Sequence, residues 1–338
     1  MGSRRYQRAV GNYGPDSGDF RLQVGSVVGA AKSQAGSRGM IGRLRRPAGV
    51  GKVLTLPAVT PAVLDFAPMK TPGFTHGFAR EVSRSLGRCE LLYVPRQEFD
   101  LPLARRQHAA YIATLEAAGI NITVLPEEPD LPDSSFVEDP AIVLDEVAVI
   151  CRPGAASRVP EVKSIERALA SVRPVRRIVS PGTLEGGDVL RMGKTLYIGM
   201  SSRTNLEGIR QCREIIRQHG YEAVGVRLKG CLHLKSAVTS PAEGVLMANA
   251  DWIDLSPFSH FEVLRVPDAE PWGANTLAIN GNVLVTGSSP RTADLLESRG
   301  LRVRRLDISE LQKAEAALTC LSLLYSVSPQ ERMVLSPE

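Results

Sequence analysis

Residues 186–209, GGDVLRMGKTLYIGMSSRTNLEGI, contain one complete structural unit. Two short apolar runs flank the Met-Gly-Lys sequence at 192–194, and such a turn between apolar runs is typical of a β-hairpin. Ser and Arg residues follow the second run and lead into a helical pattern, where Thr204 and Glu207 fit a capping box. The stretch therefore predicts a hairpin followed by a helix.

The same pattern recurs along the chain. Residues 138–165 and 274–296 repeat it in full, with a polar entry, two apolar runs around a turn, and Ser and Arg before a helical pattern. Residues 233–249 share the two strands. A fifth copy is truncated: TCLSLLYSV (319–327) supplies one strand, and FTHGFAREV (74–82) supplies its partner.

Each copy begins its first strand with a polar residue. These residues are Asp139, Asp188, His233, Asn275 and Cys320, at intervals of 49, 45, 42 and 45 residues. A period of this length is typical of radial architectures, in which units surround an axis and protect one another's sheet edges. The five side chains would then converge on a central channel. Turn chemistry is a sufficient explanation for Asn275, but a set that includes Asp, His and Cys favours a chemical site.

The composition is that of a soluble globular protein, with 43% hydrophobic and 23% charged residues in a chain of 338. The sequence has no apolar run near the roughly 18 residues that would cross a membrane, and its start lacks the apolar segment of a secretory signal. The five cysteines form no Cys-x-x-Cys pair, so neither a disulfide framework nor a zinc site is expected. A reducing cytoplasm is the simplest location.

The net charge of +5 is unevenly distributed. Residues 1–60 carry ten Lys and Arg and two Asp, a net of +8, whereas the other 278 residues carry 31 basic and 34 acidic side chains, a net of −3. We interpret residues 1–65 as a basic, disordered extension. It could be a nucleic-acid-binding arm, an Arg-rich transit peptide or a misassigned start. We favour the last, with a single catalytic domain over 69–330 that has no nucleic-acid partner.

Cys320 and His233, together with nearby carboxylates, indicate nucleophilic catalysis through a thiolate. The imidazole suits proton transfer near neutral pH. Carboxylates raise the pKa of a neighbouring thiol, which makes sense if the substrate itself brings a positive charge such as a guanidinium. Cys231 is an alternative nucleophile, although a buried packing role fits it better. The sequence contains no phosphate-binding or dinucleotide-binding motif.

Six motifs, in order, resemble those of the dimethylarginine dimethylaminohydrolases, which belong to a guanidino-modifying superfamily with the arginine deiminases and amidinotransferases. The resemblance extends from Phe74 to Val327. It implies an α/β fold, a five-bladed propeller of pseudo-fivefold ββαβ repeats around a central channel. The motifs are PDSSFVED (132–139), RPGAASR (152–158), LEGGDV (184–189), SSRTN (201–205), CLHLKS (231–236) and ALTCLS (317–322).

The resemblance also implies roles around the reacting carbon. Cys320 would be the nucleophile and His233 the proton shuttle, and Glu185 would orient the histidine and balance the charge. Glu138 and Asp139 would line the guanidinium pocket.

Other residues would hold the amino-acid end of the substrate. Arg158 and Arg203 would bind the α-carboxylate with their bidentate guanidinium groups. Asp133 would bind the α-ammonium, and the backbone at Ala314 and Glu315 would complete the pocket. Residues 85–108 occupy the place of a substrate-covering lid, and Asp188 is expected to be structural.

The implied reaction converts dimethylarginine and water to citrulline and dimethylamine through a covalent Cys-thiouronium intermediate, with neither a metal nor an organic cofactor. An arginine deiminase, or a hydrolase of another guanidino acid, would use the same residues with a different lid. An amidinotransferase and a non-catalytic binding propeller are the more remote alternatives. A small guanidino amino acid is the expected ligand, and a homodimer is possible.

Overall fold

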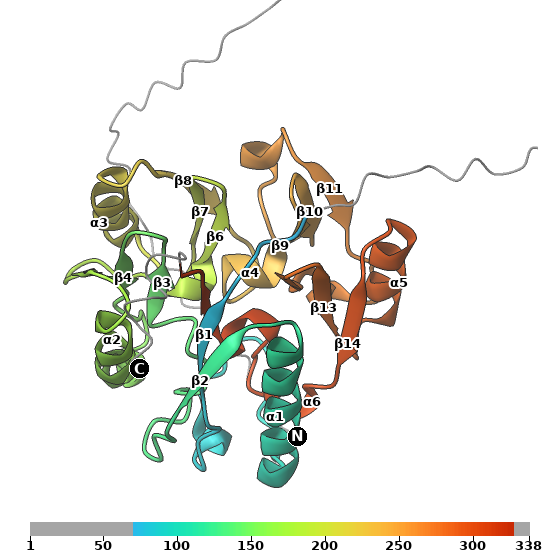
Figure 1. The fold of residues 1–338 in the computed structure, drawn as a ribbon, viewed down its shortest axis with the longest axis horizontal. Helices are drawn as coiled ribbons and strands as arrows, with labels where there is room; N and C mark the ends of the chain where they lie inside the picture. The colour runs from blue at the N-terminus through green and yellow to red at the C-terminus, as the bar shows by residue number, and fades with distance from the viewer. Residues whose placement is uncertain (1–69, 328–338) are drawn as a thin grey trace, which may run out of the picture. The chain divides into compact units, whose positions relative to one another are not determined.

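A computed structural model describes residues 70–327 of the chain (Figure 1). The predicted extension over 1–65 and the predicted domain boundaries at 69 and 330 lie outside these residues. Within 70–327, the chain forms five three-stranded sheets. Each sheet joins an antiparallel strand pair to a third strand that runs parallel to the central one. The sheets are therefore mixed, and the fold is α/β.

The unit predicted from residues 186–209 forms as expected, and its third strand follows the helix. Its elements are β6 (Val189–Met192), β7 (Thr195–Met200), α3 (Leu206–Arg217) and β8 (Glu222–Arg227). The predicted capping box is wrong by one residue. Asn205 caps α3, and its side chain accepts a hydrogen bond from the Gly208 amide at 2.8 Å. The buried Thr204 hydroxyl instead accepts from the Glu185 amide at 3.1 Å.

Two other copies have the same order of strands and helix. Their elements are β3 (Ala141–Val143), β4 (Ala148–Ile150), α2 (Val162–Ala170) and β5 (Val175–Arg177), and β12 (Leu277–Ile279), β13 (Asn282–Thr286), α5 (Pro290–Ser298) and β14 (Val303–Leu306). Numbered along the chain, these are the first and fourth units, and the unit of residues 186–209 is the second. The third unit, which begins at His233, has a single 3₁₀ turn (Ser256–Phe258) where the others have their long helix. Its strands are β9 (Val238–Ala242), β10 (Val245–Ala248) and β11 (Glu262–Arg265).

The truncated fifth copy is completed by the opposite end of the described chain, as predicted. β15 (Leu323–Tyr325) pairs antiparallel with β1 (His76–Arg80), and His76 lies opposite Tyr325. The chain continues through α1 (Leu101–Ala117) to β2 (Asn121–Leu125), which runs parallel to β1. This sheet therefore ties the two ends of the described chain together (Figure 1).

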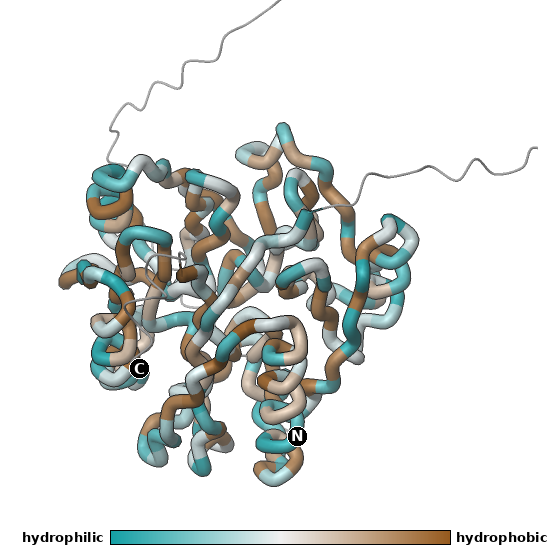
Figure 2. The backbone as a smooth tube through the Cα atoms, viewed as in Figure 1, coloured by the Kyte–Doolittle hydropathy of each residue, from teal (hydrophilic) through white to brown (hydrophobic). Residues whose placement is uncertain are grey.

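Apolar strand faces pack against the amphipathic helices. In the second unit, Leu196 and Ile198 of β7 are fully buried with Ile209 and Ile216 of α3. Hydrophobic and hydrophilic residues accordingly alternate along the helices in Figure 2. Among residues 70–327, no helix combines the length and apolar character needed to cross a bilayer.

Polar residues at the strand heads link neighbouring units. The Asp139 carboxylate accepts from the Gly187 amide at 3.0 Å, and this amide belongs to the second unit. The Asp188 carboxylate accepts from the Leu234 amide of the third unit at 2.9 Å. Each aspartate therefore fixes the start of the next repeat.

The remaining links close a circuit through all five units. Asn275 donates to the Lys235 carbonyl of the third unit at 2.9 Å and accepts from the Thr319 amide of the fifth at 3.3 Å. The Glu138 amide donates to the Cys320 carbonyl at 3.3 Å, which joins the fifth unit to the first. Asn275 thus does more than the turn chemistry that was sufficient to explain it from sequence. We call this set of contacts the strand-head circuit.

Candidate active site

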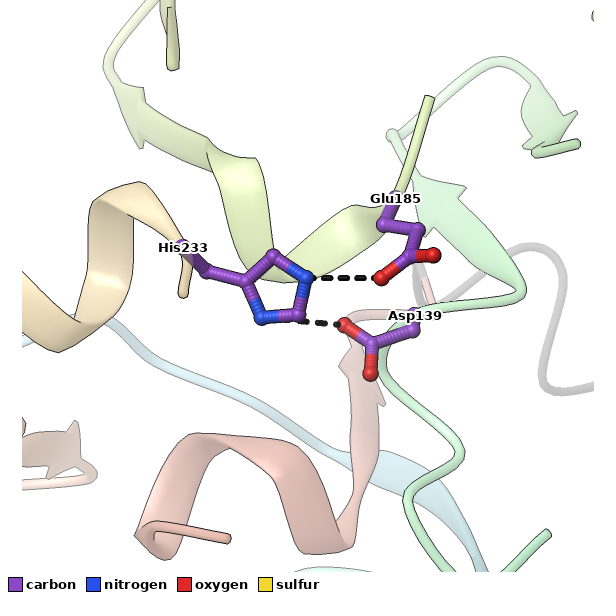
Figure 3. Close-up of side chains that lie close together, drawn as sticks. All are labelled: Asp139, Glu185 and His233. Carbon is purple, nitrogen blue, oxygen red and sulfur yellow. Dashed lines mark hydrogen bonds and ion pairs between the residues drawn. The ribbon is translucent and has the colours of Figure 1, made fainter. Parts of the chain in front are cut away.

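His233 lies between two carboxylates from neighbouring units (Figure 3). It immediately precedes the short helix α4 (Leu234–Ala237), and its Nε2 lies 2.7 Å from Oε2 of Glu185. On the other side of the ring, Nδ1 lies 3.9 Å from Oδ1 of Asp139. All three side chains are buried. Three ionisable groups thus share one water-poor site.

Two glycines allow these side chains to approach. A Cβ on Gly186 would lie 2.0 Å from the Glu138 carbonyl oxygen. A Cβ on Gly187 would lie 2.7 Å from both Asp139 Oδ1 and His233 Nδ1. The Gly-Gly sequence after Glu185 therefore places the turn against the site, which no larger residue would permit without displacement.

The electrostatics favour an imidazolium between two carboxylates. Burial alone would lower the pKa of His233, but Asp139, Glu185 and Asp188 together raise the pKa to about 9. Burial opposes ionisation of Asp139, whereas His233 and Arg158 lower the pKa of this carboxyl to about 2. The hydrogen bond from His233 likewise lowers the pKa of Glu185 against its burial. At neutral pH, His233 is therefore a proton donor.

Cys320 lies on a 3₁₀ turn, Leu318–Leu321, just before β15. Burial, followed by the Glu138 and Asp139 carboxylates, raises the pKa of its thiol above the ordinary value. The thiol is therefore protonated in the free protein. A bound cation would offset both carboxylates and favour the thiolate.

Arg158 and Arg203 occupy equivalent places beside these carboxylates. Nη1 of Arg158 lies 2.6 Å from Oδ2 of Asp139, and its other nitrogens bind Glu161. Nη1 of Arg203 lies 3.5 Å from Oε1 of Glu185. Each predicted substrate clamp is thus also a charge partner for a carboxylate that flanks His233. The sequence pattern did not predict this role, because it depends on how the loop after the second strand of a unit packs against the head of the same unit.

Asp133 and Glu315 hold a loop at the predicted lid. Both oxygens of Asp133 accept from the Glu90 amide, at 3.3 and 3.1 Å. Oε1 of Glu315 accepts from three consecutive backbone amides, Leu92, Tyr93 and Val94. The Glu315 side chain therefore has a direct role where only its backbone was expected to contribute.

The predicted lid over 85–108 is too long. Residues from Leu101 onward belong to α1, and Ala104 and Gln107 of that helix are buried in the core. Asp100 caps the helix by accepting from the Leu103 amide at 2.8 Å. Ala314 is also buried and packs against the same core. A lid in this region is limited to the residues that precede α1.

Cys231, the alternative nucleophile, is buried in an apolar cluster. Its Sγ donates to the His233 carbonyl at 3.5 Å. Burial and the nearby Asp188 raise the pKa of this thiol to about 12. Asp188 itself is fully buried and accepts from the Ser201 hydroxyl at 2.6 Å. These contacts favour packing and positioning roles for both residues.

Asp139, Glu185 and His233 could also be considered as metal ligands, because one donor atom of each lies within 4.8 Å of the others. The geometry favours a hydrogen bond between His233 and Glu185 over a metal ion held between them. His233 and Glu185 are in direct hydrogen-bonding contact at 2.7 Å, whereas a metal between them would hold each ligand atom at about 2.0 to 2.2 Å from itself. Arg158 already supplies a cation to Asp139.

Comparison with known proteins gives consistent results. A family profile described as N,N dimethylarginine dimethylhydrolase, eukaryotic, matches residues 96–256. The N(G),N(G)-dimethylarginine dimethylaminohydrolase of Pseudomonas aeruginosa is 38% identical over 228 residues, which cover 67% of this chain and 90% of that protein. The enzyme of the same name from Streptomyces coelicolor is 38% identical over 247 residues, 72% of this chain and 94% of that one.

A solved structure supports the same relationship. A mutant of the Pseudomonas aeruginosa enzyme complexed with citrulline superposes with a TM-score of 0.73 and 36% sequence identity. The match covers 75% of this chain and all of that one. The α/β fold described above is therefore shared with this enzyme.

Proposed function

The chain belongs to the dimethylarginine dimethylaminohydrolase family, and from this membership and the geometry of the site we propose that it hydrolyses Nω,Nω-dimethyl-L-arginine to L-citrulline and dimethylamine. The observation that carries the proposal is the buried His233 ring between Asp139 and Glu185, where the Asp139 carboxylate also acts on the Cys320 thiol and raises its pKa. Such a site has a proton to donate and needs a cationic substrate to activate its nucleophile.

The substrate guanidinium would bind among the carboxylates, with its carbon facing Cys320. Asp139 and Glu185 would balance its charge, and Glu138 lies close enough to Cys320 to contribute to the same field. Charge neutralisation would release the thiol proton to solvent. The resulting thiolate attacks the guanidinium carbon and forms a tetrahedral adduct.

His233 would then move two protons. The imidazolium donates one to the departing dimethylamine, which breaks the carbon–nitrogen bond and leaves a covalent thiouronium on Cys320. The neutral imidazole next takes a proton from water, and the oxygen attacks the same carbon. Collapse of this adduct expels the Cys320 thiolate, the hydroxyl proton passes to solvent, and citrulline is formed. Water supplies the product oxygen, and neither a metal nor an organic cofactor is required.

The amino-acid end of the substrate would extend toward the loop that Asp133 and Glu315 hold. We assign the α-ammonium to Asp133 and the α-carboxylate to Arg158 and Arg203, with the backbone of Ala314 and Glu315 nearby. The free carboxylate would compete with Asp139 and Glu185 for the arginines. Substrate binding and the acidity of His233 are then coupled.

The finer features of the fold and location are part of the same proposal. Five sheets joined by the strand-head circuit support a five-bladed α/β propeller with a single catalytic domain over 69–330. Five free cysteines, one of them the nucleophile, support a reducing cytoplasm. A homodimer stays a prediction, as does the basic extension over 1–65.

The test is to incubate the purified chain with dimethylarginine and, separately, with arginine, and to measure citrulline, dimethylamine and ammonia. We expect citrulline and dimethylamine in equal amounts from dimethylarginine, and neither from the Cys320→Ser variant. Ammonia and citrulline formed mainly from arginine would reassign the enzyme as a deiminase. Activity that survives in Cys320→Ser would overturn the assignment of the nucleophile.

A further inference from the structure

Lys235 forms a buried ion pair with Glu138, and both charges act on the Cys320 thiol. Nζ of Lys235 lies 2.5 Å from Oε1 of Glu138, and both side chains are largely buried. Lys235 follows His233 by two residues and lies in α4, the helix that His233 precedes, but it faces a different partner. Glu138 precedes Asp139, and its own amide binds the Cys320 carbonyl.

Both carboxylate oxygens of Glu138 are already occupied. Oε1 binds Lys235, and Oε2 accepts from the Thr319 hydroxyl at 2.9 Å. This arrangement departs from the expected role of Glu138 as a direct guanidinium ligand, because a substrate would have to share an oxygen with one of these donors. Glu138 instead connects Lys235 to the residue that precedes Cys320.

Thr319 is held from the other side as well. Its hydroxyl accepts from Nδ2 of Asn275 at 3.0 Å, and its amide donates to Oδ1 of the same side chain at 3.3 Å. Asn275 Nδ2 also donates to the Lys235 carbonyl. The contacts form a closed loop from Lys235 through Glu138, Thr319 and Asn275 back to Lys235.

The pair also forms a wall of a cavity of about 620 Å³, which Glu138, Lys235 and Thr319 line together with apolar side chains such as Leu190 and Leu323. The pair therefore meets this cavity, and through Thr319 the Glu138 carboxylate also contacts the turn that carries Cys320. A Glu138 side chain that lost Lys235 would have room to turn into the cavity.

We propose that Lys235 is a positioning residue of the proposed hydrolase: by holding the Glu138 carboxylate against the Thr319 hydroxyl, it fixes the turn on which Cys320 lies. The proposal rests on the proposed function only for its catalytic consequence. A carboxylate buried without its cationic partner is strongly disfavoured, so loss of Lys235 would displace the Glu138 carboxylate from Thr319 toward the cavity. Thr319 would then lose its acceptor, and the turn would loosen.

The experiment compares Lys235→Met, Glu138→Gln and the double variant with wild type. In Lys235→Met, kcat for dimethylarginine should fall by about tenfold to a hundredfold, the range that a displaced catalytic group produces, while KM changes by less than about threefold. In the double variant, the neutral amide still accepts from Thr319 and leaves no unpaired charge. Its kcat should return to within about threefold of wild type, well above the product of the two single effects.

Backbone hydrogen exchange of a peptide spanning 317–323 provides a measurement that does not need turnover. Exchange should accelerate in Lys235→Met and return toward wild type in the double variant. Lys163→Met, an exposed lysine on α2, serves as the matched control and should change neither measurement.

Three results would overturn the proposal: unchanged exchange in Lys235→Met, a double variant whose loss is the product of the single losses, or a raised KM with unchanged kcat, which would mean direct substrate contact. If wild type makes no citrulline, the proposed function fails, and the exchange comparison still decides whether Lys235 positions the turn.

Discussion

Replacing Glu185 by glutamine removes one carboxylate from His233 while keeping the size of the side chain. The pKa of His233 is about 9, against an ordinary value of 6.5. At about 1.4 kcal/mol per pKa unit, this difference corresponds to roughly 3 kcal/mol in favour of the imidazolium. Glu185 makes the 2.7 Å contact with Nε2, so its loss should lower the pKa of His233 by about 1 to 2.

The same difference predicts how stability depends on pH. Because folding raises the pKa of His233, the imidazolium contributes to the free energy of unfolding. This contribution is fully present below pH 6.5 and is lost as the pH rises through about 9. Burial raises the pKa values of Glu161 and Asp188 to about 7 and about 6, so the ionisation of these residues changes the stability at lower pH than that of His233. Wild type should therefore lose stability between pH 7.5 and 9.5, and Glu185→Gln should lose much less over that interval.

Two assays measure these effects. Histidine ring NMR, with His233→Asn identifying the resonance among the five histidines, gives the pKa directly, and urea unfolding at a series of pH values gives the stability. A wild-type His233 that titrates near 6.5, or a Glu185→Gln variant with an unchanged His233 pKa, would refute the electrostatic reasoning.

Three further predictions concern the glycines, the circuit and the loop. Gly187→Ala should lower the free energy of unfolding by about 1 to 3 kcal/mol and abolish most activity, because its Cβ would meet Asp139 and His233. Gly225→Ala is the control, since a Cβ there meets nothing within 4 Å. Equal effects of the two substitutions would contradict the argument. Asn275→Ala should cost about 1 to 3 kcal/mol in urea unfolding, and an unchanged midpoint would show that the strand-head circuit is dispensable. Glu315→Gln should speed hydrogen exchange at residues 92–94 and raise KM severalfold, whereas unchanged exchange would remove the carboxylate from any role in holding the loop.

Much of the fold could be predicted because each hairpin is encoded locally. Apolar alternation and turn residues lie close together in each unit, so the paired strands of a hairpin followed from the local pattern. The pairing of 319–327 with 74–82 joins distant segments, and it was predicted because the truncated fifth copy lacked a second strand. The N-cap of α3 was missed by one residue, because Thr204 and Asn205 both suit a cap and only packing decides that Thr204 turns inward to Glu185.

The partners of the site residues could not be predicted in the same way. Cys320, His233 and Glu185 were identified by their positions and by resemblance. Arg158 with Asp139 and Glu315 with the 92–94 amides are contacts between separate segments of one unit, whereas Lys235 with Glu138 joins the third unit to the first. These contacts depend on how the loops of a unit pack against its strands and on the rotation of one unit against the next, and the local strand and helix patterns contain neither.

The strand-head circuit suggests why chemistry occurs at only some of the five equivalent positions. In the first, second and fourth units, the side chains of Asp139, Asp188 and Asn275 bind the backbone of the following repeat. In the third and fifth units, main-chain atoms make the link instead, through the carbonyls of Lys235 and Cys320. The side chains of His233 and Cys320 are therefore not needed to join the units. The proposed proton shuttle and the proposed nucleophile therefore occupy the two positions where the repeat architecture does not require the strand-head side chain as a link.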